Sequence, residues 1–123
     1  AANIDQVLIT VSVVNPPLKP SLVDRYIIAA FKGGMEPVIL INKIDLLVPG
    51  SEEKELFDLF LLTYQELKIP VIPLSVKTEE GIEALKMQMK DKASVFSGQS
   101  GVGKSSLINM VTGLSLAVGE VIE

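Results

Sequence analysis

The chain has 123 residues, 48% of them hydrophobic, with a net charge of −4 and a mean hydropathy of +0.43. It contains no cysteine and no histidine, which excludes disulfides, thiolate catalysis, Cys/His zinc sites and a Ser-His-Asp triad within these residues. The negative charge counts against a stand-alone RNA-binding module. The apolar runs fall short of the roughly 20 residues of a membrane span and the first residues resemble no signal peptide, so we expect a cytoplasmic protein without a membrane partner.

Strand and helix signals alternate along the chain. A β-branched run at residues 6–14 predicts a buried strand ended by Asn15-Pro16-Pro17, and Ser21 predicts the N-cap of a helix that Gly33 ends. Further strands are expected at residues 37–41, 70–74 and 93–97, and further helices from Ser51 to about 68, from about 80 to 91, and at 104–112. In the helix that begins at Ser51, the expected inner residues are Leu56, Phe60, Tyr64 and Leu67.

Four strand–helix pairs in succession predict a three-layer α/β domain, with a parallel sheet covered by helices on both faces. Ligands of such sheets bind beyond the carboxyl ends of the strands. The loops at that edge are residues 15–20, 42–50, 75–81 and 98–103, and the last three carry recognisable chemistry.

The loop after the fourth predicted strand matches G-x-x-x-x-G-K-[ST], the pattern of a phosphate-binding loop. Glycines let backbone N–H groups approach phosphate oxygens closely, and the helix that follows directs its positive end at the anion. Lys104 is expected to reach the β- and γ-phosphates, and the Ser105 hydroxyl to bind Mg²⁺, so these two are the expected catalytic residues. The expected nucleotide contacts in this loop are Gly98, Gln99, Ser100, Gly101, Val102, Gly103, Lys104, Ser105 and Ser106.

The loop after the second predicted strand contains Asn42-Lys43-Ile44-Asp45. Guanine presents N1–H and N2–H₂ on one edge, and the Asp45 carboxylate accepts from both at once, whereas adenine has no such pair of donors. Asn42 is expected either to tie neighbouring loops together or to face N7 of the base. The Lys43 stem is expected to lie along the base plane while its ammonium stays solvated.

The loop after the third predicted strand contains Ser75-Val76-Lys77. A backbone N–H of this loop is expected to donate to guanine O6, and the Lys77 stem to pack on the base. The position of these three residues supports this assignment. They follow the next strand after residues 42–45, and successive strands of a parallel sheet are usually neighbours.

The order of these motifs is unusual for a GTPase. Ordinary guanine-nucleotide domains begin with the phosphate loop, whereas here the two base-reading loops come first and the phosphate loop last. A site built from loops at one edge of a sheet depends on their positions in space, so joining the old termini and opening another loop leaves it intact. The sequence therefore predicts a circularly permuted GTPase that binds GTP or GDP with Mg²⁺.

The chain resembles the circularly permuted GTPases of ribosome assembly, and most of all the RsgA (YjeQ/YloQ) family of small-subunit biogenesis GTPases. The residues that carry the resemblance are 3–6, 42–45, 75–77 and 95–109, the last reading VFSGQSGVGKSSLIN. The resemblance implies GTP hydrolysis to GDP and phosphate, stimulated by the small ribosomal subunit, and binding to that subunit and its rRNA late in its maturation. It also implies an OB-fold before the GTPase domain and a zinc-binding domain after it, and a monomeric full protein.

Family members continue past the phosphate-loop helix into a switch with a Mg²⁺-binding Thr and then a D-x-x-G segment, and residues 113–123 contain neither. We therefore expect residues 1–123 to be a partial GTPase domain, with ribosome contacts mostly in the missing domains. By analogy with ordinary GTPase sheets, the four strands are expected in the order fourth, first, second, third. The strand at residues 93–97 would then have an open edge, which invites pairing with a second chain.

Three alternatives stay open at this point. The chain could be part of an ATP-dependent kinase or ATPase whose NKID sequence is coincidental, although its first strand supplies no acidic Mg²⁺-side residue at its end. It could be another permuted ribosome-assembly GTPase, although these tend to carry a Pro-Asn-Val-Gly type of loop. It could also bind nucleotide as a scaffold without turnover.

Overall fold

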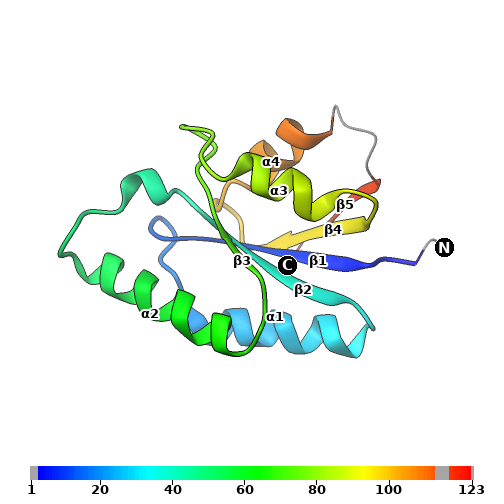
Figure 1. Ribbon diagram of the computed structural model, residues 1–123, viewed down its shortest axis with the longest axis horizontal. Coiled ribbons are helices and arrows are strands. Elements are labelled where there is room, and N and C mark those ends of the chain that lie inside the picture. The colour runs from blue at the N-terminus through cyan, green and yellow to red at the C-terminus, as the bar shows by residue number, and fades with distance from the viewer. Residues whose placement is uncertain (1–2, 113–116, 123) are drawn as a thin grey trace.

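The computed structural model describes residues 3–112 and 117–122, and its centre is a parallel sheet. The strands are β1 (Gln6–Ser12), β2 (Glu36–Asn42), β3 (Val71–Pro73), β4 (Ala93–Gly98) and β5 (Ala117–Ile122). Their order across the sheet is β3-β2-β1-β4-β5, and every neighbouring pair is parallel (Figure 1). The expected order of the first four strands is confirmed.

Helices cover both faces of this sheet, as expected for a three-layer α/β domain (Figure 1). The helices α1 (Pro20–Lys32) and α2 (Glu52–Glu66) lie on one face, and α3 (Ile82–Met89) and α4 (Lys104–Val111) on the other. Successive strand residues point to opposite faces, so Ile39 packs toward α1 and α2 while Val38 and Leu40 pack toward α3 and α4. Over residues 3–112 and 117–122, no helix combines the length and apolar character needed to span a membrane.

The expectation of an open edge at the strand of residues 93–97 is wrong. β5 pairs with β4 along its whole length, from Ala93 opposite Ala117 to Gly98 opposite Ile122. Unpaired N–H and C=O groups at a sheet edge favour hydrogen bonding to a further strand. Here β5 of the same chain is that strand. The association with a second chain that we expected from an open edge at β4 therefore loses its basis.

The expected N-cap of α1 is also wrong. The helix begins at Pro20 with Lys19 at the N-cap position, where the structure shows no side-chain capping bond within the described residues, and Ser21 lies inside the first turn. Proline is favoured at the first helical position because its φ is already helical and its missing N–H would have had no partner there. The helix thus begins at Pro20, two residues before Leu22, where a cap at Ser21 would have started it.

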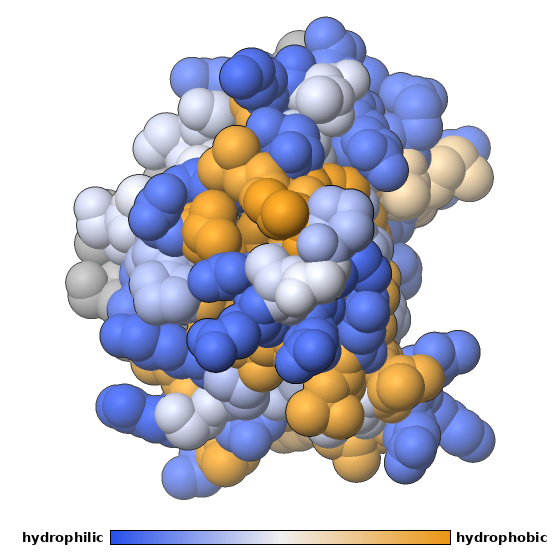
Figure 2. All heavy atoms as spheres, turned by 90° about the vertical axis from the view of Figure 1, so that its left-hand side faces the viewer, coloured by the Kyte–Doolittle hydropathy of each residue, from blue (hydrophilic) through white to orange (hydrophobic). Residues whose placement is uncertain are grey.

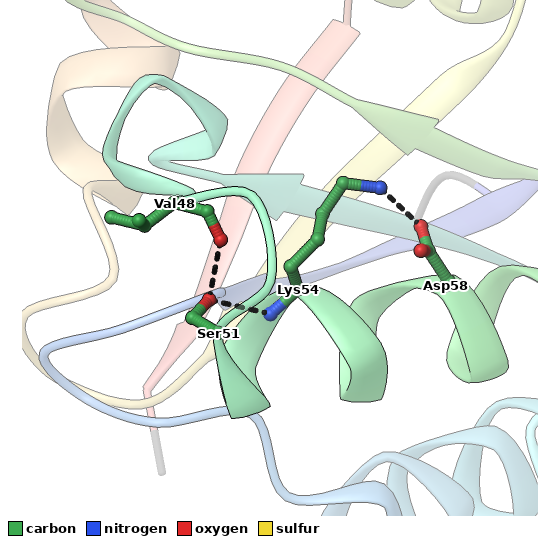
Figure 3. Close-up of polar contacts among 4 residues, drawn as sticks. All are labelled: Val48, Ser51, Lys54 and Asp58. Carbon is green, nitrogen blue, oxygen red and sulfur yellow. Dashed lines mark hydrogen bonds and ion pairs between the residues drawn. The ribbon is translucent and has the colours of Figure 1, made fainter.

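Ser51 does cap α2, as expected (Figure 3). Its hydroxyl accepts a hydrogen bond from the Lys54 N–H at 3.1 Å and donates to the Val48 carbonyl at 2.6 Å. Lys54 also forms an ion pair with Asp58 at 2.6 Å, one turn further on. The cap fixes the point at which the chain leaves the loop after β2, and this loop carries part of the site described below.

Replacing Ser51 by alanine is expected to lower the free energy of unfolding by about 1 kcal/mol, because two hydrogen bonds at the helix start are lost. The matched control is Ser21→Ala, which removes an exposed hydroxyl from the first turn of α1 without removing a cap. Chemical denaturation of both variants measures the difference. Equal losses for the two serines would contradict the capping role of Ser51.

The inner face of α2 differs in part from the predicted stripe. Phe60 and Tyr64 are buried as expected, but Leu67 is 60% exposed and Phe57 takes an inner position instead. The Tyr64 hydroxyl donates to the Asp24 carboxylate on α1, which joins the two helices. Burial, together with this hydrogen bond and the Asp24 charge, raises the pKa of Tyr64 above its ordinary range.

Candidate functional site

The loops that follow β2, β3 and β4 surround one cavity at the carboxyl edge of the sheet. Figure 2 looks onto this edge and shows apolar side chains gathered among hydrophilic ones. The cavity has a volume of about 410 Å³. Its lining residues come from all three loops and are Asn42, Lys43, Asp45, Leu46, Val76, Lys77, Gly103 and Ser106.

Asn42 holds these three loops together. It ends β2 and is buried, with 3% of its surface exposed. Its Nδ2 donates to the Val102 carbonyl of the phosphate loop at 2.9 Å, and its Oδ1 accepts from the Val76 N–H at 3.2 Å and from the Lys43 N–H at 2.8 Å. Of the two roles expected for Asn42, the geometry shows the one that ties the loops together.

Asp45 lies in the single-turn 3₁₀ helix η1 (Ile44–Leu46), directly after β2. Its Oδ1 accepts a hydrogen bond from the buried Ser75 hydroxyl at 2.8 Å, and that hydroxyl in turn accepts from the Thr78 N–H at 3.1 Å. The carboxylate is therefore held in one orientation while the residue itself remains exposed at the cavity. The sequence placed Ser75 near the base but missed this hydrogen bond, because motif spacing does not reveal which way a hydroxyl points.

Two glycines give the phosphate loop its shape. Gly98 has φ +149°, and a Cβ there would lie 2.3 Å from the Thr10 carbonyl oxygen of β1. Gly103 has φ +91°, and a Cβ there would lie 2.2 Å from Nδ2 of Asn42. Both distances are far below a normal contact distance. A side chain at Gly98 would therefore displace the backbone of β1, and a side chain at Gly103 would displace the Asn42 amide that joins the loops. The resulting concave run of backbone, at the start of α4, fits a phosphate group.

Lys104 begins α4 and is buried beside this loop, with 8% of its surface exposed. Its Nζ donates to the carbonyl of Gly98, the first residue of the loop, at 2.9 Å, so the ammonium lies beside the start of the loop. Ser105 and Ser106 are exposed in the first turn of α4, where a helix carries its partial positive charge. Lysine ammonium, hydroxyls and helix N-terminus together suit a polyphosphate.

The remaining predicted residues and one unpredicted residue complete the edge. Val102 is buried and its carbonyl accepts from Asn42, Gln99 is half-buried, and Ser100 and Gly101 are exposed. Leu46 was not predicted, yet it lines the cavity and is 45% exposed. Among residues 3–112 and 117–122, no three His, Cys, Asp or Glu side chains come together as a metal site.

The chain is similar to known GTPases over its whole length. The family model described as RsgA GTPase matches residues 1–123. The chain is 48% identical over 122 residues to the small ribosomal subunit biogenesis GTPase RsgA of Shewanella oneidensis and 44% identical over 120 residues to that of Pectobacterium atrosepticum. Both alignments cover 98% of this chain but 34% and 32% of the relatives, so the chain spans about a third of their length.

Two solved structures share the fold. The chain matches YjeQ from Thermotoga maritima with a TM-score of 0.78 and 39% identity, over 93% of this chain and 40% of that one. It matches YloQ, whose structure is described as that of a circularly permuted GTPase, with a TM-score of 0.79 and 31% identity, over 90% of this chain and 38% of that one. The similarity to these structures and the late position of the phosphate loop agree with the permuted order inferred from the sequence.

Proposed function

The chain belongs to the RsgA GTPase family, and we propose that it binds guanine nucleotides as part of a protein that hydrolyses GTP to GDP and phosphate. The observation that carries this proposal is the joining of the three loops by Asn42, because it brings a carboxylate and a phosphate loop to the same cavity. The cavity volume of about 410 Å³ lies within the range of small-molecule sites.

Recognition of guanine is assigned to Asp45. Ser75 occupies its Oδ1 and fixes the plane of the carboxylate, which is then ready to accept N1–H and N2–H₂ of guanine in a charge-assisted pair. Carboxylate oxygens have about four acceptor positions, so the Ser75 bond leaves room for both base donors. The Lys43 and Lys77 stems line the same cavity and offer apolar surface to the base.

Binding of the phosphates is assigned to the phosphate loop and the start of α4. Backbone N–H groups of the loop would donate to phosphate oxygens, and the Lys104 ammonium, now on the Gly98 carbonyl, would exchange that acceptor for a phosphate oxygen. Ser105 is the residue that would hold Mg²⁺ through its hydroxyl. Bound Mg²⁺ would neutralise part of the phosphate charge that develops in phosphoryl transfer.

Positioning and electrostatic stabilisation are proposed to carry catalysis. We name no general base, because Asp45 is the only carboxylate among the described residues that line the cavity and it is assigned to the guanine edge. Lys104 and the loop N–H groups supply positive charge where the transferred phosphoryl group gains negative charge.

The partner of the whole protein is proposed to be the small ribosomal subunit with its rRNA, because the relatives are named small ribosomal subunit biogenesis GTPases. The protein would then work in the cytoplasm, as a monomer. The zinc site that the family resemblance implies would belong to a separate domain, because residues 1–123 contain no cysteine or histidine to bind the metal.

Base selectivity tests the proposal. Fluorescent GDP is bound to the protein and competed with GDP, ADP and XDP, for wild type, Asp45→Asn and the control Asp58→Asn. Wild type is expected to prefer GDP, and Asp45→Asn to weaken GDP binding about 30-fold, because a charge-assisted pair of hydrogen bonds is lost. The same variant is expected to bind XDP more tightly, since the new amide donates to the carbonyl that xanthine has in place of the amino group.

Asp58→Asn removes a carboxylate from the exposed face of α2, outside the cavity, and is expected to leave every affinity unchanged. Competition by ADP as effective as that by GDP in wild type would refute guanine recognition.

A further inference from the structure

The loop between β1 and α1 is the fourth loop at the carboxyl edge, and neither the motifs nor the proposed function gives it a role. One ammonium connects it to the site. Nζ of Lys43 donates to the Asn15 carbonyl of this loop and, at 2.9 Å, to the Gly101 carbonyl of the phosphate loop. The sequence motif predicts a solvated ammonium for Lys43, and both of these contacts are exposed, so the ammonium bridges two loops at the surface.

The position of the Asn15 carbonyl depends on an unusual backbone conformation. Asn15 has φ +48°, in the left-handed region that asparagine and glycine tolerate and that β-branched residues avoid. Two hydrogen bonds fix the chain on either side: the Val13 N–H donates to the Asn42 carbonyl at 3.2 Å, and the Ser12 hydroxyl donates to the Pro16 carbonyl at 2.8 Å. The loop is thus fastened to the end of β2.

The same loop lies next to the phosphate loop. A Cβ built on Gly101 would lie 3.8 Å from Cδ of Pro16, an ordinary van der Waals contact. Pro16 therefore lies beside Gly101 of the phosphate loop, and Asn42 holds the same loop through the Val102 carbonyl.

We propose that Asn15 is a positioning residue of the guanine site: its left-handed backbone directs its carbonyl onto the Lys43 ammonium and so holds the lysine stem against the base. This inference rests on the proposed function. A lysine stem without an anchor samples many rotamers, and binding would have to restrict them. With the ammonium fixed on two carbonyls, the stem is ordered before the nucleotide arrives.

The test is a graded series at position 15 in two backgrounds, with the Kd for fluorescent GDP as the readout. Because the acting group is a backbone carbonyl, Asn15→Gly is the rescue variant and is expected to stay within about twofold of wild type. Asn15→Ala is expected to weaken binding about threefold and Asn15→Val about tenfold, as the left-handed conformation becomes harder to reach. In the Lys43→Met background, which has no ammonium to anchor, the same substitutions are expected to change affinity less than about twofold.

Asp91→Val is the matched control. Asp91 has φ +61° and lies in the turn before β4, at the amino end of the sheet, so valine there causes similar backbone strain away from the site. It is expected to lower the melting temperature and to leave the Kd for GDP unchanged.

Equal losses of affinity from Asn15→Val in the wild-type and Lys43→Met backgrounds would overturn the inference, because the effect would not pass through Lys43. If Asn15→Val does not fold, the ratio of the Kd values of Asn15→Ala and Asn15→Gly is compared in the two backgrounds. An equal ratio in both would likewise overturn the inference. A wild-type protein that binds ADP as well as GDP would instead refute the proposed function itself. A wild type that prefers GDP, with a flat series at position 15, refutes the positioning role alone.

Discussion

A single added methyl group, in Gly103→Ala, is expected to weaken GDP binding about 1000-fold. Gly103 has φ +91°, a conformation that costs alanine about 1 kcal/mol or more, and its new Cβ would lie 2.2 Å from Nδ2 of Asn42. Relief of that contact requires Asn42 to leave the Val102 carbonyl, which it now reaches at 2.9 Å. The base loop and the phosphate loop would then separate at the point where they are joined.

Gly50→Ala separates this effect from backbone strain. Gly50 has φ +82°, and no heavy atom of the described residues lies within 4 Å of a Cβ built there. The variant is expected to lose about 1 kcal/mol of stability and to keep its affinity for GDP. Calorimetric titration and chemical denaturation measure both quantities. A Gly103→Ala protein that binds GDP within tenfold of wild type would contradict the claim that Asn42 must join the base-reading and phosphate loops for binding.

Asn42→Asp is expected to have the second largest effect, although it changes the shape of the side chain very little. The amide group that donates to the Val102 carbonyl becomes an oxygen, so two acceptors face each other at a position only 3% exposed. We expect the free energy of unfolding to fall by about 2–4 kcal/mol, because a charge and a carbonyl are left buried without a donor. We expect GDP affinity to fall about 100-fold, because the phosphate loop is released.

Asn109→Asp is the control for the added charge. Asn109 is an exposed residue of α4, so the same substitution there is expected to change stability by less than about 0.5 kcal/mol and to leave affinity unchanged. Urea titration and the Kd for GDP compare the two variants. Similar small effects at both positions would show that Asn42 does not join the loops.

The phosphate loop and the strand order could be predicted because backbone requirements leave a direct mark on the sequence. Only glycine accepts the conformation and contacts at Gly98 and Gly103, and a lysine and a hydroxyl residue follow at a fixed spacing. The alternation of strands and helices likewise restricts the topology to a parallel sheet. The functional roles of the individual residues remain predictions.

Other features depend on three-dimensional contacts that local pattern does not encode. Leu67 continues the apolar spacing of α2, but it lies at the end of the helix, beyond the core, and Phe57 is buried instead. The hydrogen bond from Ser75 to Asp45 joins two loops that are 30 residues apart in sequence. β5 was missed because the segment after α4 is short and contains Gly119, which weakens a strand signal.

The most direct test of guanine-nucleotide binding at this edge of the sheet is a crystal structure of the protein with GDP and Mg²⁺. We expect N1 and N2 of guanine to lie within hydrogen-bond distance of the Asp45 carboxylate and the β-phosphate to accept hydrogen bonds from the backbone N–H groups at the start of α4. Phosphates bound at α4 with the base turned away from Asp45, or a nucleotide bound outside this cavity, would contradict it.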